Sequence, residues 1–98
     1  MSEADAVRAV TTHLQQAFPG SSVQDAEDDD RHAYSFRLTD ASGGPVALVT
    51  VSDEFLEDVA AQEIDRRLAT MRLADVVRAA GPTTRVIVAT TGVRTEAR

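Results

Sequence analysis

The chain lacks lysine, cysteine, asparagine and tryptophan, so all ten of its basic residues are arginines. Without a thiol or an ammonium side chain, it has no means to build a cysteine nucleophile, a Schiff-base lysine, a P-loop lysine or a cysteine-ligated metal site. Aromatic residues are also scarce, and the whole set is Phe18, Tyr34, Phe36 and Phe55. The predicted core is therefore small and aliphatic, made mostly of alanine and valine.

Positive charge is in short supply. Sixteen acidic residues against ten arginines give a net charge of −6 and a pI of about 4.7. Nucleic-acid binding needs a basic face that neutralises phosphates, so we expect no nucleic-acid partner. No apolar run approaches the roughly 18 residues of a membrane span, and Glu3 and Asp5 lie where a signal peptide carries cationic residues. We expect no membrane partner and a cytoplasmic location.

The length of 98 residues limits the chain to one domain. We expect a single α+β domain over residues 1–91, and a flexible tail over 92–98, whose composition is typical of a frayed end. Arginine without lysine, together with abundant alanine, valine and aspartate, is typical of a high-GC bacterial genome.

Hydrophobic periodicity predicts a helix and then a three-stranded antiparallel meander. The expected elements are a helix over residues 3–18, a polar edge strand over 22–27, a half-buried strand over 32–39 and a central strand over 46–51. In the half-buried strand, His32 is expected on the apolar face because it alternates in phase with Tyr34 and Phe36. The Gly-rich segment 40–45 is typical of a hairpin turn.

Residues 53–80 have a helical pattern whose phase changes. A continuous helix of this length would span about 42 Å, against a gyration radius of about 13 Å for a domain of this size. We therefore expect two helices, or one broken helix, with a break near residues 69–72. A final buried strand over 85–91 then returns through this helical crossover, parallel to the 46–51 strand, and completes one mixed four-stranded sheet.

The meander brings two acidic segments to one end of the predicted sheet. The turn at residues 28–30 and the segment 53–58 together carry seven carboxylates, with His32 beside them. Hard cations prefer carboxylate oxygens, so this acidic pole is a candidate metal site. The candidate ligands are Asp28, Asp30, His32, Asp53 and Glu54. The alternative, which we favour, is a solvated turn next to a helix start whose acids complement the helix dipole.

Leu73, Val76 and Val77 fall on nearly the opposite side of the helical pattern from the apolar residues that precede them. They either pack on the sheet from a separate helix, which is the commoner case, or form an exposed apolar patch. In the second case they are candidate partner-binding residues, and the partner is another protein or a second copy in a homodimer.

The element order over about residues 3–91 resembles the core of the restriction-endonuclease-like nucleases. That family places an acid and a lysine on its central strand, whereas this strand reads Val46-Ala-Leu-Val-Thr-Val51, so the family's catalysis is not expected. The size, the acidity and the opening topology are also similar to those of the dimeric chaperones of bacterial type III secretion, which implies a binding role.

No motif in the chain names a reaction. There is no Gly-x-Ser-x-Gly elbow, and we assign no catalytic residue and no cofactor. We predict a small, acidic, non-enzymatic protein-interaction or accessory module. Two alternatives stay open: a metal-dependent enzyme that uses the acidic pole, and a secretion-chaperone-like binding protein.

Overall fold

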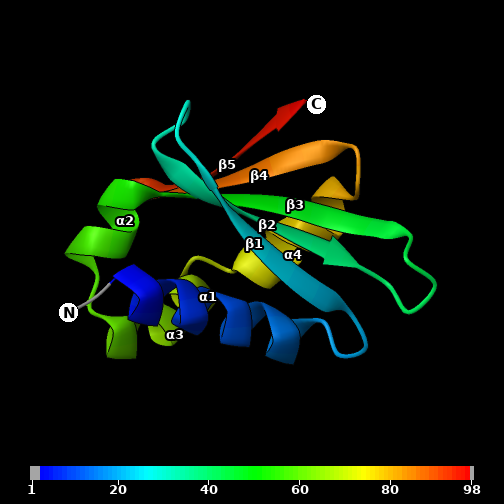
Figure 1. Cartoon of the computed structure of the whole chain (residues 1–98), viewed down its shortest axis with the longest axis horizontal. Coiled ribbons are helices and arrows are strands. Elements are labelled where there is room, and N and C mark those ends of the chain that lie inside the picture. The colour runs from blue at the N-terminus through cyan, green and yellow to red at the C-terminus, as the bar shows by residue number, and fades with distance from the viewer. Residues whose placement is uncertain (1–2, 98) are drawn as a thin grey trace.

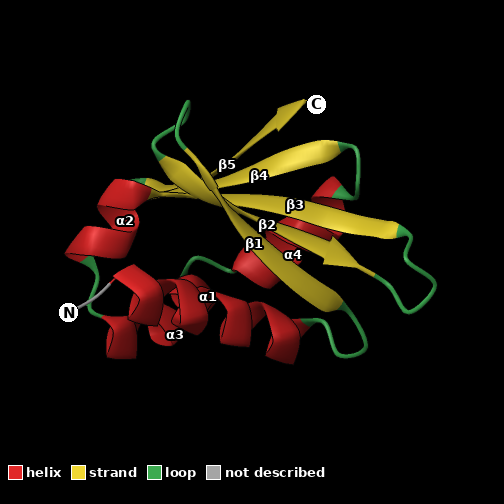
Figure 2. Cartoon of the chain, viewed as in Figure 1, coloured by secondary structure: helices red, strands yellow, loops and turns green. Residues whose placement is uncertain are grey.

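The computed structural model describes residues 3–97 and shows a five-stranded mixed sheet with helices on one face (Figures 1 and 2). In chain order the elements are α1 (Glu3–Ala17), β1 (Ser22–Asp28), β2 (Ala33–Thr39), β3 (Pro45–Ser52), α2 (Asp53–Asp58), α3 (Ala61–Thr70), α4 (Leu73–Ala80), β4 (Thr84–Ala89) and β5 (Gly92–Ala97). The strands lie in sequence order across the sheet, with β3 and β4 parallel and the other neighbours antiparallel. The α+β class, the meander and the parallel return of β4 are confirmed.

The sheet has five strands rather than the predicted four. The segment predicted as a flexible tail, residues 92–98, contains a strand instead. Gly92–Ala97 forms β5 and pairs with β4 along the whole strand, from Ala89 opposite Gly92 to Thr84 opposite Ala97, and residue 98 lies outside the described residues. Val93 of β5 packs against the main core. Because the strand is short and mostly polar, it lacks the hydrophobic alternation from which strands are predicted.

The segment 53–80 forms three helices. The predicted break near residues 69–72 is confirmed, since Arg72 has a left-handed backbone with φ 58° between α3 and α4. A second break after α2 was missed. There Val59 turns to an extended conformation, yet its side chain stays buried at 6% exposure. The hydrophobic pattern thus continues through a residue where the helix ends, so periodicity gives no sign of this break.

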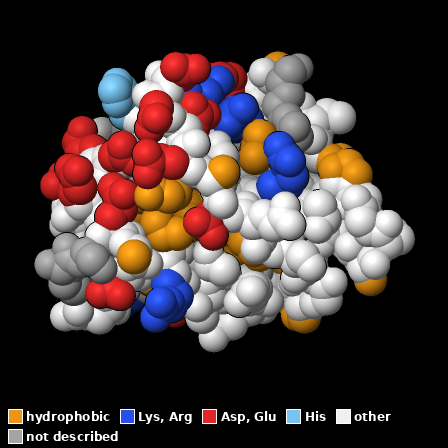
Figure 3. Space-filling model, viewed as in Figure 1, with side chains coloured by type: hydrophobic (Ala, Val, Ile, Leu, Met, Phe, Trp, Pro, Cys, Tyr) orange, Lys and Arg blue, Asp and Glu red, His pale blue; other side chains and the backbone are white. Residues whose placement is uncertain are grey.

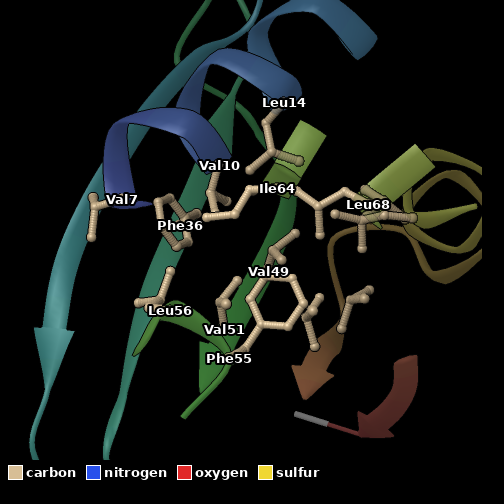
Figure 4. Packing of buried hydrophobic residues seen from close by; sticks show 14 of the residues in the cluster. Val7, Val10, Leu14, Phe36, Val49, Val51, Phe55, Leu56, Ile64 and Leu68 are labelled. Atoms are coloured by element: carbon tan, nitrogen blue, oxygen red, sulfur yellow. The ribbon is translucent and has the colours of Figure 1, made fainter. Parts of the chain in front are cut away.

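One aliphatic core lies between the helices and the sheet. Phe36, Val49 and Val51 point from β2 and β3 toward apolar side chains of the helices (Figure 4). The helical contribution comes from Val7, Val10 and Leu14 of α1, Phe55 and Leu56 of α2, Ile64 and Leu68 of α3, and Leu73 and Val77 of α4. Helices α1 and α3 are also joined at the surface, where His13 Nδ1 lies 2.7 Å from Asp65 Oδ1.

The three apolar residues with altered phase lie on α4. Leu73 and Val77 are 0% and 1% exposed and belong to the core, as the packing alternative expects. A partner cannot contact them in this structure. Val76 is only partly buried, and its part in partner binding stays a prediction.

Asp40 holds the β2–β3 turn together. Its Oδ1 accepts hydrogen bonds from the Ser42 hydroxyl at 2.7 Å, from Ser42 N at 3.0 Å and from Gly44 N at 2.8 Å. These donors favour the ionised carboxylate, and the Ser42 hydroxyl has the largest effect. They hold the pKa of Asp40 below its usual range.

We expect Ser42→Ala to raise the pKa of Asp40 toward its ordinary value, because it removes the strongest donor. A folded pKa that is lowered stabilises the fold above the unfolded pKa, and this contribution is lost as the pH falls through the folded pKa. Carboxyl ¹³C NMR titration measures the change. Ser21→Ala, in a different turn, serves as the control and should leave Asp40 unaffected. An unchanged Asp40 titration in Ser42→Ala would contradict this assignment of cause.

Candidate functional site

The β1–β2 turn and the start of α2 lie side by side at one end of the sheet. Asp53 N donates a hydrogen bond to His32 O at 2.9 Å, which ties the last residue of the turn to the first residue of α2. Figure 3 shows acidic side chains gathered over this end of the molecule. The structure therefore brings together the two acidic segments, residues 28–30 and 53–58, that the meander topology placed at one pole.

His32 lies in the turn and not on the core face of β2. Its backbone is left-handed with φ 51°, its N–H donates to Asp29 O at 3.3 Å, and its side chain is exposed. Strand β2 begins only at Ala33. The predicted strand over 32–39 is therefore wrong at its first residue. Histidine is among the residues that tolerate a left-handed turn position, and apolar alternation does not reveal such a position.

The start of α2 is fixed by a side-chain cap. Ser52 Oγ accepts a hydrogen bond from Phe55 N at 3.1 Å, which places Asp53 and Glu54 in the first turn. Thr90 Oγ1 donates to Glu54 Oε1 at 3.3 Å and so links the acidic segment to the end of β4. Within residues 3–97, Asp53 Oδ1 is a buried acceptor with no hydrogen-bond partner.

The candidate metal ligands do not form a coordination site. They are Asp28, Asp30, His32, Asp53 and Glu54. In the part of the chain that the structure describes, no group of three His, Asp or Glu side chains is placed to hold a metal ion. Asp28 faces Arg31 instead, with 3.9 Å between Oδ2 and Nε. The geometry gives the metal alternative no support.

The face of the sheet opposite to the described helices is hollowed next to the acidic turn. The hollow has a volume of about 530 Å³. Its rim includes residues 27–30, and its floor includes Ser35, Arg37, Leu48 and Arg85. Acidic groups therefore surround a floor that carries two arginines and a hydroxyl group.

A polar network crosses the floor of this hollow. Thr50, in the middle of β3, is 2% exposed. Its Oγ1 accepts a hydrogen bond from Arg85 Nη1 at 2.6 Å and lies 3.2 Å from Ser35 Oγ. The Arg85 guanidinium thus lies across Thr50 on the face of the sheet opposite to the described helices. This network is not predicted from the sequence, where its only signal is a threonine in an otherwise apolar strand.

The sheet is curved so strongly that the β1–β2 turn reaches the opposite edge strand. Arg31 Nη2 donates to Glu96 Oε1 at 2.9 Å, although β1 and β5 are the outermost strands. This hydrogen bond and the charge of Arg31 hold the pKa of Glu96 below its usual range. The sequence does not predict this contact, because the composition of residues 92–98 is typical of a flexible tail.

A second polar cluster lies beside α1. The Tyr34 hydroxyl lies 2.9 Å from Glu3 Oε1 and 3.0 Å from Glu27 Oε1. The hydrogen bond to Glu3 has the largest effect, and with Glu27 it raises the pKa of Tyr34 well above its usual range. Tyr34 therefore acts as a neutral donor that ties α1 to the edge of the sheet.

Comparisons with known proteins add no relative. No protein-family model, no curated protein and no solved structure matches this chain. The resemblances to nucleases and to secretion chaperones therefore gain no support. Within the described residues, no helix has the length and apolarity needed to cross a membrane.

Proposed function

We propose that the protein is a non-enzymatic protein-interaction module. Its acidic end, which is the acidic pole formed by residues 28–30 and 53–58, binds a basic segment of a partner protein. The observation that carries this proposal is the juxtaposition of residues 28–30 with the first turn of α2, held by the hydrogen bond from Asp53 N to His32 O. The net charge of −6 supports it, because the field of an acidic protein attracts cationic partners over long distances.

The groups at the acidic end are suited to hydrogen-bond donors that carry positive charge. Asp29, Asp30 and Glu54 are exposed, and carboxylates form their strongest hydrogen bonds with guanidinium and ammonium groups. Arg31, the cation of the turn, already binds Glu96 and leaves these acids exposed.

The hollow adds shape to the charge. It shares residues 28–30 with the acidic end, so a segment that lies along these acids passes the mouth of the hollow. Leu48 gives the floor an apolar surface, and Arg37 gives it a cation. A partner side chain that enters there therefore meets a different chemistry from the rim, which supports recognition of a particular segment.

An octa-arginine peptide tests the acidic end directly. In ¹⁵N-detected titrations at low ionic strength, we expect amide shifts to concentrate at residues 28–32 and 53–58. The triple variant Asp28→Asn, Asp29→Asn, Asp30→Asn should bind about tenfold more weakly, because it removes three carboxylates from one site.

The matched control is Glu63→Gln, Asp65→Asn, Asp75→Asn, which removes the same number of negative charges from α3 and α4. It should weaken binding by no more than about twofold, since net charge acts mainly at long range and is screened by salt. Equal losses in the two variants, or shifts scattered over all acidic residues, would show that only the net charge matters and would overturn the proposal.

A further inference from the structure

The two edges of the sheet differ in charge. The first edge, β1, carries Asp25, Glu27 and Asp28, and charge of a single sign protects an edge strand against pairing with another chain. The last edge, β5, carries one cation and one anion, Arg94 and Glu96. Because β5 is the last strand of the sheet, the backbone N–H and C=O groups on its outer side are not part of the ladder with β4.

We propose that β5 is a homodimer interface, in which two copies pair antiparallel about a two-fold axis at Thr95. The two-fold axis is perpendicular to the sheet, so pairing of the two β5 strands joins both sheets into one. Residues of β5 then lie opposite residues of β5 in the second copy. Val93 then faces the partner's Ala97, Arg94 faces the partner's Glu96, and Thr95 faces the partner's Thr95.

The charges select this register. With the axis at Arg94 the two arginines would face each other, and with the axis at Glu96 the two glutamates would do so, and like charges directly opposite are destabilising. Registers shifted by a single residue are not available, because opposite residues in an antiparallel pair lie on the same face. With the axis at Thr95, apolar residues pair on the helix side and opposite charges pair on the other side.

The contact within the strand does not compete strongly. Arg94 Nη1 lies 3.7 Å from Glu96 Oε2 in the same chain, and the Arg94 side chain is 69% exposed. Directly opposite residues of paired strands bring their Cβ atoms to about 5 Å, whereas residues two apart in one strand are roughly 6.5 Å apart. The partner's Glu96 therefore lies nearer to Arg94 than Glu96 of its own chain, and the exposed guanidinium has room to turn toward it.

The same axis places the helices of both copies on one side of the joined sheet. Helix α4 lies over β3, β4 and β5, so the two α4 helices face each other across the axis. Val76 and Ala80 of α4 and Val93 of β5 are partly buried apolar side chains that pack against the core. Pairing of so few residues gives a small interface, and we expect a reversible dimer with a Kd of about 10–100 µM.

Charge reversal tests the register. In sedimentation equilibrium, the wild-type chain should dimerise, whereas Arg94→Glu and Glu96→Arg should each weaken self-association at least about tenfold because like charges then face each other. An equimolar mixture of the two variants restores opposite charges at both positions and should form a heterodimer. A wild-type chain that stays monomeric at about 1 mM would overturn the proposal, as would a mixture that fails to associate.

Glu96→Arg also removes the contact with Arg31, so a second measurement is needed. The chain has no cysteine, and a single introduced thiol therefore reports on its own symmetry mate. Thr95→Cys lies on the axis and should form an intermolecular disulfide under mild oxidation. Val93→Cys faces the partner's Ala97 and should cross-link far more slowly. A dimer in which both variants cross-link at the same rate uses another surface, and that result would contradict the interface at β5.

Discussion

Phe36→Ala is expected to destabilise the fold by about 3–5 kcal/mol, the largest effect of any single substitution considered. Phe36 is 0% exposed in the middle of β2, and Val10 of α1 and Ile64 of α3 point toward its ring (Figure 4). Removal of the ring leaves a cavity where two helices meet the sheet, and close-packed surroundings fill such a cavity only in part. Urea unfolding followed by circular dichroism measures the loss.

Phe18→Ala is the matched control for Phe36→Ala. Phe18 follows α1, its side chain is only partly buried, and the Arg78 guanidinium carbon lies 5.1 Å from the centre of its ring. Truncation there removes less buried area and should destabilise the fold by about 1 kcal/mol. Equal effects at the two positions would mean that Phe36 does not occupy the centre of the core.

A chain that stops after Thr91 is expected to be less stable by about 3 kcal/mol or more. It loses the ladder between β4 and β5, in which each hydrogen bond contributes about 0.5–1.5 kcal/mol, together with the packing of Val93. For a domain of this size, such a loss lowers the thermal midpoint by more than about 10 °C. Differential scanning calorimetry measures this midpoint. If residues 92–97 were a flexible tail rather than strand β5, truncation would leave the midpoint unchanged.

Truncation after Thr91 removes both the β4–β5 ladder and the side-chain contact between Arg31 and Glu96. The variant Arg31→Ala, made in the full chain, removes only the side-chain contact. It removes the ion pair with Glu96 and leaves β5 in place. Both partners are more than a third exposed, so we expect a much smaller loss than truncation causes. If Arg31→Ala destabilised the protein as much as truncation does, the ion pair rather than strand pairing would hold β5.

Sequence patterns predicted the elements that bury apolar residues. In the first helix and in β2 these residues recur at the period of the structure, whereas β3 and β4 are nearly continuous apolar runs, and all four elements are placed within a few residues. The hydrophobic pattern gave wrong element boundaries where the burial of a residue does not reflect its backbone conformation. Val59 is buried where a helix ends, and His32 takes a left-handed turn position just before a buried Ala33.

The candidate site was predictable only as far as topology determines it. A meander must return its third strand to the end where the first turn lies, so the acidic segments could be placed together without coordinates. The network of Thr50, Arg85 and Ser35 depends instead on the register between β3 and β4, in which Arg85 stands opposite Leu48 and Ile87 stands opposite Thr50. No local pattern encodes that register.

The ion pair between Arg31 and Glu96 connects the β1–β2 turn to β5, although the two residues lie 65 positions apart in the sequence. Arg31 also lies 3.9 Å from Asp28, so its guanidinium stands between a carboxylate of the acidic end and a carboxylate of the outer strand. A ligand that displaces Arg31 from Asp28 or from Glu96 changes how the Arg31 guanidinium is placed relative to the other carboxylate. If a ligand bound at the β1–β2 turn changes the affinity of β5 for the β5 of a second copy, then by thermodynamic linkage that pairing changes the affinity of the turn for the ligand by the same factor.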